Sequence, residues 1–195
     1  MTRQLWSGNT VNYNGQYYQV ENMKFYDLPS QPVPIYVAAN GPKAMYRSGR
    51  YGDGLITDPK MLMNQQGMNN FRMGAMDAGK DPTAMPILVE SYVVVGDEAE
   101  ARQVAELWRF SPKSWDTYVN VPDPVQIRQR ADSEVMIDQV IQNWTISTDP
   151  QKHVDAINKF FSMGVTQVYI HSAQPDQQKV IDFYGSQVLP KLRMS

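Results

Sequence analysis

Four places in the chain set polar side chains in or directly after short apolar runs, and each could do chemistry. They are the segments Asn40-Gly41-Pro42-Lys43-Ala44 and Thr57-Asp58-Pro59-Lys60, the carboxylate Glu90 and the imidazole His171. Short apolar runs are typical of strands buried in a parallel sheet. Ligands of parallel α/β folds bind at the carboxyl ends of such strands, so these four places are the candidate binding positions.

The first segment, residues 40–44, leads from an apolar run through a glycine turn into the start of a predicted helix. Free N–H groups at a helix start, at the positive end of the helix dipole, suit a phosphate or another anion. Asn40 and Gly41 let the backbone approach a ligand, and Lys43 adds positive charge. The dinucleotide pattern G-x-G-x-x-G is absent, so an ordinary turn between strand and helix is the alternative.

The other places also leave two interpretations open. Thr57 and Lys60 offer a hydroxyl and a cation to an anionic substrate group, or they belong to a solvated loop. Glu90 lies inside an apolar strand, where a carboxylate is costly without a partner, so it is a hydrogen-bonded structural acid or a catalytic one. His171 could act as an acid or base near neutral pH or pack against the next loop, while His153 is expected on the surface of a helix or at its cap.

Apolar runs and helix signals alternate along the chain and define the elements that must position these residues. Strands are predicted at residues 35–39, 54–57, 87–95 and 168–171, and helices at 43–48, 61–78, from 97, 125–130, 137–143, from 148 and 177–189. The methionines between residues 61 and 76 are predicted to form a core-facing stripe. Asn14-Gly15 predicts a tight β-hairpin turn, and the segment 111–124 predicts a functional lid or a disordered loop. Strand–helix alternation indicates an α/β fold with parallel strands.

Composition removes several classes of function. The chain has 195 residues, no cysteine, two histidines and 20 acidic against 18 basic residues, for a net charge of −2. Disulfides and thiolate metal sites are excluded, a metal site is not expected, and no basic excess favours nucleic acid. The sequence has no apolar run of about 20 residues and no apolar leader at Met1–Trp6, so we expect no membrane contact and a cytoplasmic location.

Segments over nearly the whole chain stand in a recognisable order and spacing. They are Leu5-Trp-Ser-Gly8, Asn14-Gly-Gln-Tyr-Tyr18, Pro34-Ile-Tyr-Val-Ala-Ala-Asn-Gly-Pro42, Gly49-Arg-Tyr-Gly-Asp-Gly-Leu-Ile-Thr57, Asn143-Trp-Thr-Ile-Ser-Thr-Asp-Pro150, Gln167-Val-Tyr-Ile-His171, Pro175-Asp-Gln177 and Val188-Leu-Pro-Lys-Leu-Arg193. Together they resemble the luciferase-like oxidoreductases, in particular the branch with glucose-6-phosphate dehydrogenases that use the deazaflavin coenzyme F420. The resemblance implies a TIM barrel, a homodimer, and hydride transfer between substrate and coenzyme.

The resemblance also implies roles for particular residues. Asn40, Gly41, Lys43 and Ala44 fall on the turn that lines the coenzyme, with Asn40 where the family has glycine. Among the groups around the substrate phosphate of the sugar-phosphate dehydrogenases, Thr57 and Lys60 match a threonine and a lysine. Tyr118 and Asn143 stand where a second lysine and an arginine are expected. Loss of two charged ligands weakens phosphate binding, so an alcohol or a less charged hydroxy compound is the expected substrate rather than glucose 6-phosphate.

The resemblance further implies that the chain is the second half of a barrel. A TIM barrel has eight strands in about 250 residues, and four strand–helix units are predicted here. We therefore expect residues 1–195 to form one luciferase-like domain, the C-terminal half of a (β/α)8 barrel with an N-terminal β-hairpin. The family's catalytic residues come from the first half, so none is assigned here. An FMN-dependent monooxygenase of the same fold and a non-catalytic, cofactor-binding half-barrel are the alternatives.

Overall fold

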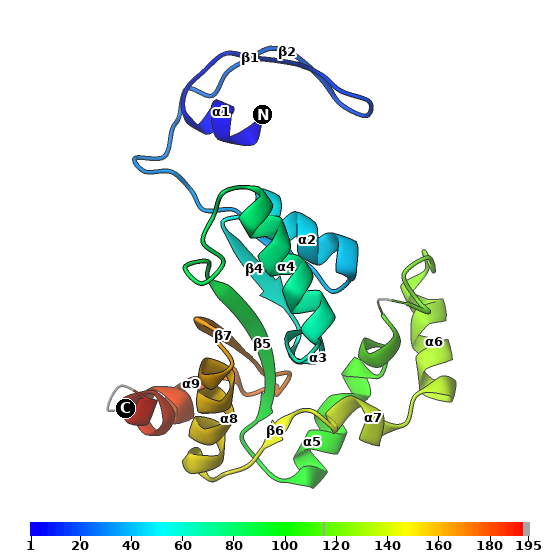
Figure 1. Cartoon of the computed structure of the whole chain (residues 1–195). Helices are drawn as coiled ribbons and strands as arrows, with labels where there is room; N and C mark the ends of the chain where they lie inside the picture. The colour runs from blue at the N-terminus through cyan, green and yellow to red at the C-terminus, as the bar shows by residue number, and fades with distance from the viewer. Residues whose placement is uncertain (115, 193–195) are drawn as a thin grey trace.

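A parallel sheet forms the centre of the molecule in the computed structural model, which describes residues 1–114 and 116–192. Its strands are β3 (Tyr36–Ala38), β4 (Gly54–Thr57), β5 (Ile87–Val94) and β7 (Gln167–His171), side by side in that order (Figure 1). These are the four predicted strands. A fifth strand, β6 (Thr145–Ile146), pairs with the end of β5 and was not predicted, because two residues carry no detectable periodicity. Arg193 of the last motif and Trp115, which belongs to the segment 111–124, lie outside the described residues.

The register of the sheet separates two faces. Ile56 pairs with Leu88 on the next strand, and Leu88 pairs with Gln167. Paired residues point to the same side of the sheet, and the residues before and after them point to the other side. One side packs Leu55 and Val89 against helices and forms the core of the domain. The other side, which we call the open face, carries several exposed side chains. Within the described residues β3 pairs with β4 alone, so this sheet is open rather than a closed barrel.

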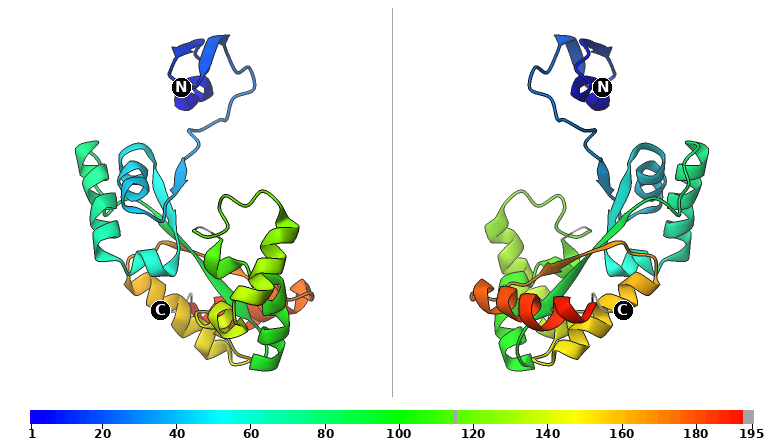
Figure 2. Two further views of the ribbon diagram at one scale, coloured as in Figure 1. Left: turned by 90° about the vertical axis from the view of Figure 1, so that its right-hand side faces the viewer. Right: turned by 90° about the vertical axis from the view of Figure 1, so that its left-hand side faces the viewer.

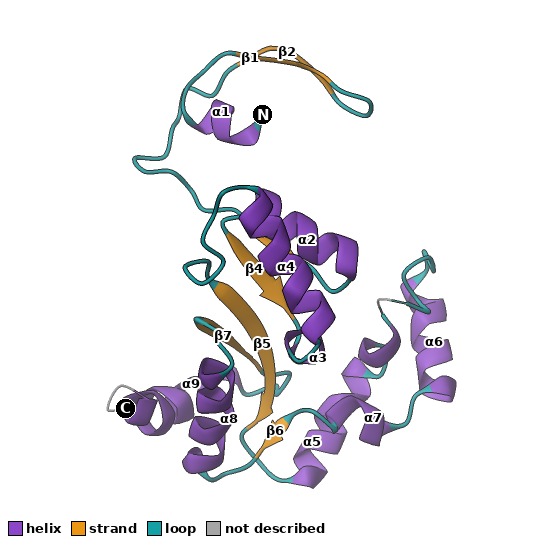
Figure 3. Ribbon diagram, viewed as in Figure 1, coloured by secondary structure: helices purple, strands orange, loops and turns teal. Residues whose placement is uncertain are grey.

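Helices cover the core side of the sheet (Figure 3). These are α2 (Pro42–Tyr51), α3 (Pro59–Leu62), α4 (Gln65–Asp77), α8 (Pro150–Ser162) and α9 (Gln177–Phe183), which continues through a π-helical turn at Tyr184–Val188 into α10 (Leu189–Leu192). The single helix predicted at residues 61–78 is wrong. Asn64 interrupts it by accepting the Gly67 N–H at 2.9 Å, which starts a new helix after α3. The predicted methionine stripe is also wrong in part, because Met68 is buried whereas Met73 and Met76 are exposed.

Two glycines bring α2 and α4 into backbone contact. A Cβ atom on Gly49 would lie 2.0 Å from the Phe71 carbonyl oxygen, and one on Gly74 would lie 2.0 Å from the Tyr46 carbonyl oxygen. Only a residue without a side chain fits at either position. The pair therefore fixes the spacing of α2, the helix that follows the Asn40–Gly41 turn.

A lysine from the loop after α4 secures the other end of α2. Lys80 Nζ donates to three carbonyl oxygens there, those of Gly49 at 3.1 Å, Arg50 at 3.0 Å and Gly52 at 2.7 Å. The last carbonyl groups of a helix have no partner within the helix, and they carry its negative dipole end. The ammonium satisfies them and holds the end of α2 against the loop that follows α4.

A second group of helices lies beyond the end of β5, to one side of the sheet (Figure 2). It contains α5 (Glu98–Ala105), the 3-10 turns η1 (Glu106–Trp108) and η2 (Ser111–Lys113), α6 (Pro124–Glu134) and α7 (Ile137–Ile141). Ala105, Val135, Val140 and Ile141 form its core. Asp97 caps α5, which begins where a helix was predicted, by accepting the Glu100 N–H at 2.9 Å.

The N-terminal segment extends away from the sheet (Figure 1). It contains α1 (Thr2–Trp6) and the antiparallel strands β1 (Val11–Asn14) and β2 (Gln19–Met23). The tight Asn14-Gly15 turn is a wrong prediction: four residues, 15–18, join the strands, and neither Asn14 nor Gly15 has a positive φ. Arg3 connects α1 to the body through an ion pair with Asp53 at 2.8 Å.

His153 corrects another expectation, because its ring is fully buried in α8 rather than on the surface. Its Nε2 lies 2.9 Å from the Ser147 carbonyl oxygen and its Nδ1 lies 2.8 Å from the Tyr184 hydroxyl. Because a carbonyl only accepts, Nε2 carries the proton and Nδ1 accepts from Tyr184. Burial lowers the pKa of His153 and raises that of Tyr184, so the pair is a neutral structural contact. Phe161, an apolar residue of the same helix, is 43% exposed.

Candidate functional site

The open face of the sheet gathers polar and aromatic side chains toward the carboxyl ends of the strands. Glu90 lies beside Tyr169, and one step further along the strands Tyr92 lies beside His171. Glu90 is exposed, and Tyr169 is 58% exposed. In parallel α/β folds this end of the sheet binds ligands. Glu90 and His171, singled out in the sequence, therefore belong to one surface.

Five rings form what we call the aromatic cluster: Tyr92, Trp108, Phe110, Trp144 and His171. The Tyr92 ring stacks on His171 at 4.8 Å and on Trp144 at 5.8 Å between ring centroids. Trp108 meets Tyr92 and His171 edge-on at 5.6 and 5.0 Å, and Phe110 stacks on Trp108 at 5.7 Å. The cluster builds an apolar wall around the imidazole at the end of β7.

Sequence reasoning found only His171 of the aromatic cluster. Tyr92, Trp108 and Trp144 come from β5, η1 and the turn before β6, which are separate in the sequence. The run Trp108-Arg-Phe110 was the one local signal for it, since two aromatic residues so close together in a connecting segment often mark a contact surface.

Glu90 does not need the partner that its apolar neighbours suggested. Its side chain is exposed on the open face, and within the described part of the chain no hydrogen bond or ion pair engages it. Burial and then the nearby Glu90 charge raise the pKa of the Tyr92 hydroxyl. Glu90 therefore places a solvated negative charge on the surface next to the aromatic cluster.

Asn40 and Thr57, from the two predicted polar segments, lie in direct contact. The Thr57 hydroxyl lies 3.0 Å from both the Ala39 carbonyl oxygen and Asn40 Oδ1, and Asn40 Oδ1 also accepts the Asp58 N–H at 3.3 Å. Thr57 is buried. A hydroxyl has one hydrogen to donate, and the Thr57 hydroxyl donates it to these protein oxygens. The two predicted binding segments are thus one rigid structure joining the ends of β3 and β4.

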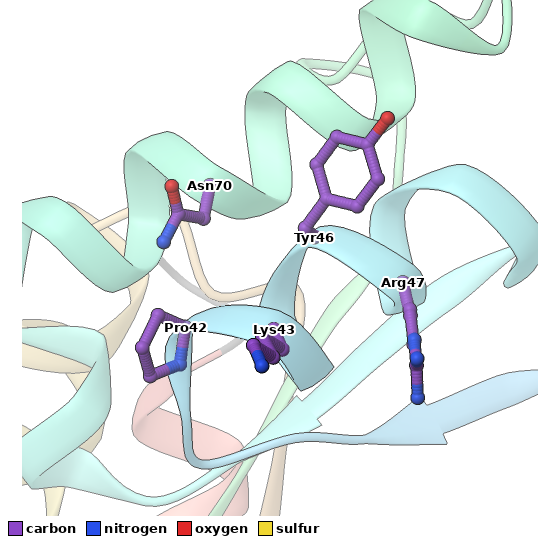
Figure 4. Close-up of a pocket in the computed structure, with 5 residues that line it drawn as sticks. All are labelled: Pro42, Lys43, Tyr46, Arg47 and Asn70. Atoms are coloured by element: carbon purple, nitrogen blue, oxygen red, sulfur yellow. The ribbon is translucent and has the colours of Figure 1, made fainter.

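Gly41, Lys43 and Ala44 differ in their access to solvent. A Cβ on Gly41 would meet no atom within 4 Å, so space is open in front of this turn. Lys43 is exposed and lines a cavity of about 300 Å³ between α2 and α4 (Figure 4). Ala44 packs against the core cluster instead. Lys60, on α3, is exposed and has no ion-pair partner in the described ranges.

Tyr118 and Asn143, the other two predicted substrate residues, lie in the second helical group. Tyr118 is buried, its hydroxyl donates to Glu134 Oε2 at 3.2 Å, and the Arg130 guanidinium lies 5.2 Å from its ring centroid. Burial and then Glu134 raise its pKa. Tyr118 thus anchors the predicted lid to α6. Asn143 is exposed in the turn before β6, directly before Trp144 of the aromatic cluster.

A buried amide joins the loops that follow β5 and β7. Gln174 Oε1 accepts the Val95 N–H at 2.7 Å, and its Nε2 donates to Glu100 Oε1 at 2.5 Å. Lys179 Nζ donates to the same carboxylate at 3.1 Å. Glu100 therefore links the first turn of α5 to these two partners. The network holds the two strand ends that carry Tyr92 and His171.

The described residues contain no group of three histidine, aspartate or glutamate side chains placed to hold a metal ion. Within those same residues, no helix is both long and apolar enough to cross a bilayer. The site is thus a set of polar turns, an unpaired carboxylate and an aromatic wall at one end of a parallel sheet.

The structure is a mixed α/β fold built on a parallel sheet, with polar turns at the carboxyl ends of its strands. The profile of the family described as luciferase-like monooxygenase matches residues 1–167. The chain belongs to this family.

Several relatives have described activities. The chain is 39% identical over 193 residues to an F420-dependent hydroxymycolic acid dehydrogenase of Mycobacterium tuberculosis, covering 99% of this chain and 52% of the relative. It is 32% identical over 197 residues to an F420-dependent glucose-6-phosphate dehydrogenase of Nakamurella multipartita, covering 99% and 58%. A solved F420-dependent secondary alcohol dehydrogenase, in complex with an F420-acetone adduct, superposes with a TM-score of 0.84 at 28% identity, covering 98% and 58%. The chain spans about half to three fifths of the length of these relatives.

Proposed function

We propose that this chain is the coenzyme- and substrate-binding half of a coenzyme F420-dependent oxidoreductase that acts on an alcohol. The observation that carries the proposal is that the joined Asn40–Thr57 turn and the aromatic cluster both lie toward the carboxyl ends of strands in one sheet. The relatives named above, all described as F420-dependent, support the choice of coenzyme. The two candidate halves of the site, coenzyme turn and substrate wall, occupy neighbouring strands.

The residues at the turn after β3 fit the anionic part of such a coenzyme. Space is open in front of Gly41, and no side chain caps the start of α2. Its free N–H groups and the exposed Lys43 favour a phosphate. The coenzyme, when bound, supplies a deazaflavin ring that exchanges a hydride with the substrate carbon. This chain's part is to hold the coenzyme at Asn40, Gly41 and Lys43 and to exclude water with the aromatic cluster.

The substrate side favours an uncharged hydroxy compound over a sugar phosphate. A phosphate needs donors, but the Thr57 hydroxyl hydrogen is taken by the protein and the Tyr118 hydroxyl by Glu134. Lys60 is the remaining cation among the predicted substrate residues, and Glu90 adds a negative charge to the open face. An aromatic wall suits the carbon skeleton of an alcohol.

Fluorescence titration of the purified chain tests both parts. Coenzyme F420 should bind and FMN should bind at least tenfold more weakly; tighter binding of FMN would contradict the coenzyme assignment. A secondary alcohol should then perturb tryptophan emission in wild type but not in Trp108→Ala, while glucose 6-phosphate should not. Micromolar binding of glucose 6-phosphate would contradict the substrate class. We also propose that the chain forms a homodimer. A molar mass measured by light scattering that equals that of one chain would contradict this.

A further inference from the structure

A second cavity, of about 310 Å³, lies in the second group of helices, between α6 and the segment that contains η1. None of its described lining residues is among those predicted to bind coenzyme or substrate. Most of the wall is apolar. The apolar part consists of Leu107, Phe110, Pro124, Ile127 and Ala131.

These apolar side chains form a hollow that is open to solvent. Ala131 is buried, with 1% of its surface exposed, whereas Leu107 is 64% exposed and Phe110 is 37% exposed. Large apolar side chains that stay in water around a cavity often mark a binding surface. A mostly apolar pocket of about 300 Å³ with a few polar groups has the size and character of a site for a small molecule.

Phe110 gives this cavity an aromatic wall. Its ring stacks on Trp108 at 5.7 Å between centroids, with 24° between the ring planes. The same ring lines the cavity and keeps more than a third of its surface exposed, so the part that Trp108 does not cover is available to a ligand. Aromatic rings prefer to stack, offset or edge-on, with other aromatic rings. The wall therefore favours a ligand that carries a planar ring.

Four charged side chains also line the cavity, and three of them are engaged with one another. Arg109 donates to both carboxylate oxygens of Glu106, at 2.7 and 3.0 Å, and its Nε lies 3.9 Å from Asp132 Oδ1. A third donor of Arg109, Nη1, reaches the Val135 carbonyl oxygen at 2.9 Å. These contacts fix the three groups as part of the wall.

Arg128, the fourth charged residue, is different. It is exposed on α6, and it has neither an ion pair nor a hydrogen bond with any residue that the structure describes. A guanidinium matches a carboxylate with two parallel hydrogen bonds. Glu106 and Asp132 line the same cavity, so a second negative charge on the ligand would be repelled. The charges therefore favour a ligand with one carboxylate.

We propose that the cavity between η1 and α6 binds a small aromatic monocarboxylate, with its ring against Phe110 and its carboxylate paired with Arg128. This site does not depend on the proposed function, because it uses neither the turn after β3 nor the predicted substrate residues. An exposed pair with Arg128 strengthens binding by up to about fivefold. Ring stacking on Phe110 adds a factor of about two to ten.

Isothermal titration calorimetry of the purified chain with three probes tests both contacts. Cinnamate carries the ring and the charge, cinnamamide keeps the ring without the charge, and 3-cyclohexylpropanoate keeps the charge without the aromatic ring. For a ligand of this size we expect cinnamate to bind with a Kd of about 0.1–1 mM. Cinnamamide should bind about fivefold more weakly and 3-cyclohexylpropanoate about threefold more weakly.

Two variants assign the contacts to residues. Arg128→Gln should weaken cinnamate binding about fivefold and make the Kd values of cinnamate and cinnamamide equal. Phe110→Leu keeps an apolar wall but should bring the Kd values of cinnamate and 3-cyclohexylpropanoate together. The matched control is Lys152→Gln, which removes an exposed cation from α8 and should bind all three probes as the wild type does.

Three results would overturn the proposal. The first is no cinnamate binding at concentrations up to about 5 mM. The second is equal affinity of the wild type for cinnamate and cinnamamide, or an Arg128→Gln variant that binds cinnamate as tightly as the wild type. The third is a Phe110→Leu variant that keeps the wild-type preference for the aromatic acid.

Discussion

The contact between α2 and α4 predicts that Gly74→Ala destabilises the protein, although alanine is the better helix former. In an open helix the exchange gains about 1 kcal/mol. Here the new Cβ would lie 2.0 Å from the Tyr46 carbonyl oxygen and 3.1 Å from the Arg50 nitrogen. Both neighbours are backbone atoms of α2, so the helices must separate by about 1 Å or more to reach an ordinary contact.

Overpacking of this kind costs typically 1–3 kcal/mol, and occasionally more. Because the atoms that clash belong to two backbones, we expect the upper end, and a net loss of about 2 kcal/mol after the gain in helix propensity. For a chain of this size that corresponds to a fall in Tm of about 4–8 °C. The displacement of α2 should also weaken coenzyme binding at the Asn40–Gly41 turn.

Thermal unfolding followed by circular dichroism measures the effect. The matched control is Gly185→Ala, which lies in the π-helical turn after α9 and whose added Cβ would meet no atom within 4 Å. Gly185→Ala should keep or raise the Tm. A Gly74→Ala variant as stable as wild type would refute the close backbone packing of α2 and α4.

Two further predictions concern stability. His153 has a pKa below its usual value of 6.5 because it is buried, so the folded state binds fewer protons than the unfolded state and stability should fall as pH drops below about 6.5. Between pH 7.5 and 5.5, urea unfolding should show a smaller loss in the free energy of unfolding for His153→Phe than for wild type. An equal loss in both would mean that other groups cause the pH dependence. Lys80→Met removes three charged hydrogen bonds from the end of α2 and should cost about 1.5–3 kcal/mol, measured by the same method. Lys159→Met, an exposed site on α8, should cost little, and equal losses in the two variants would contradict the capping role.

The strands and most helices could be predicted because their signals are local. The β-branched run at residues 87–95 and the caps Asp97 and Asp149 act within a few residues of themselves. The predicted helix at residues 61–78 and the predicted tight turn at Asn14-Gly15 were wrong, because in each case the local pattern was overridden. Asn64 began a new helix inside an apolar pattern, and residues 15–18 formed a longer loop than Asn14-Gly15 suggests.

Some residues of the candidate site could likewise be predicted from local signals, and others could not. Strand ends can be read from the sequence, so the turns at Asn40 and Thr57 were found, together with Glu90 and His171. The aromatic cluster was not, because ring contacts depend on the register of β5 with β6 and β7 and on the path of η1. The anchoring of Tyr118 by Glu134 likewise depends on how the segment 111–124 packs on α6.

The sequence by itself determined the family, the α/β alternation and the polar turns that follow the strands, since each depends on residue order and short spacing. Only the tertiary structure decided which of these residues meet. It joined Asn40 to Thr57, buried His153 against Tyr184, left Glu90 in solvent and set Lys43 and Arg47 around one cavity. The physical reason is that periodicity fixes which way a side chain points from its own element, whereas register and helix packing decide what lies opposite.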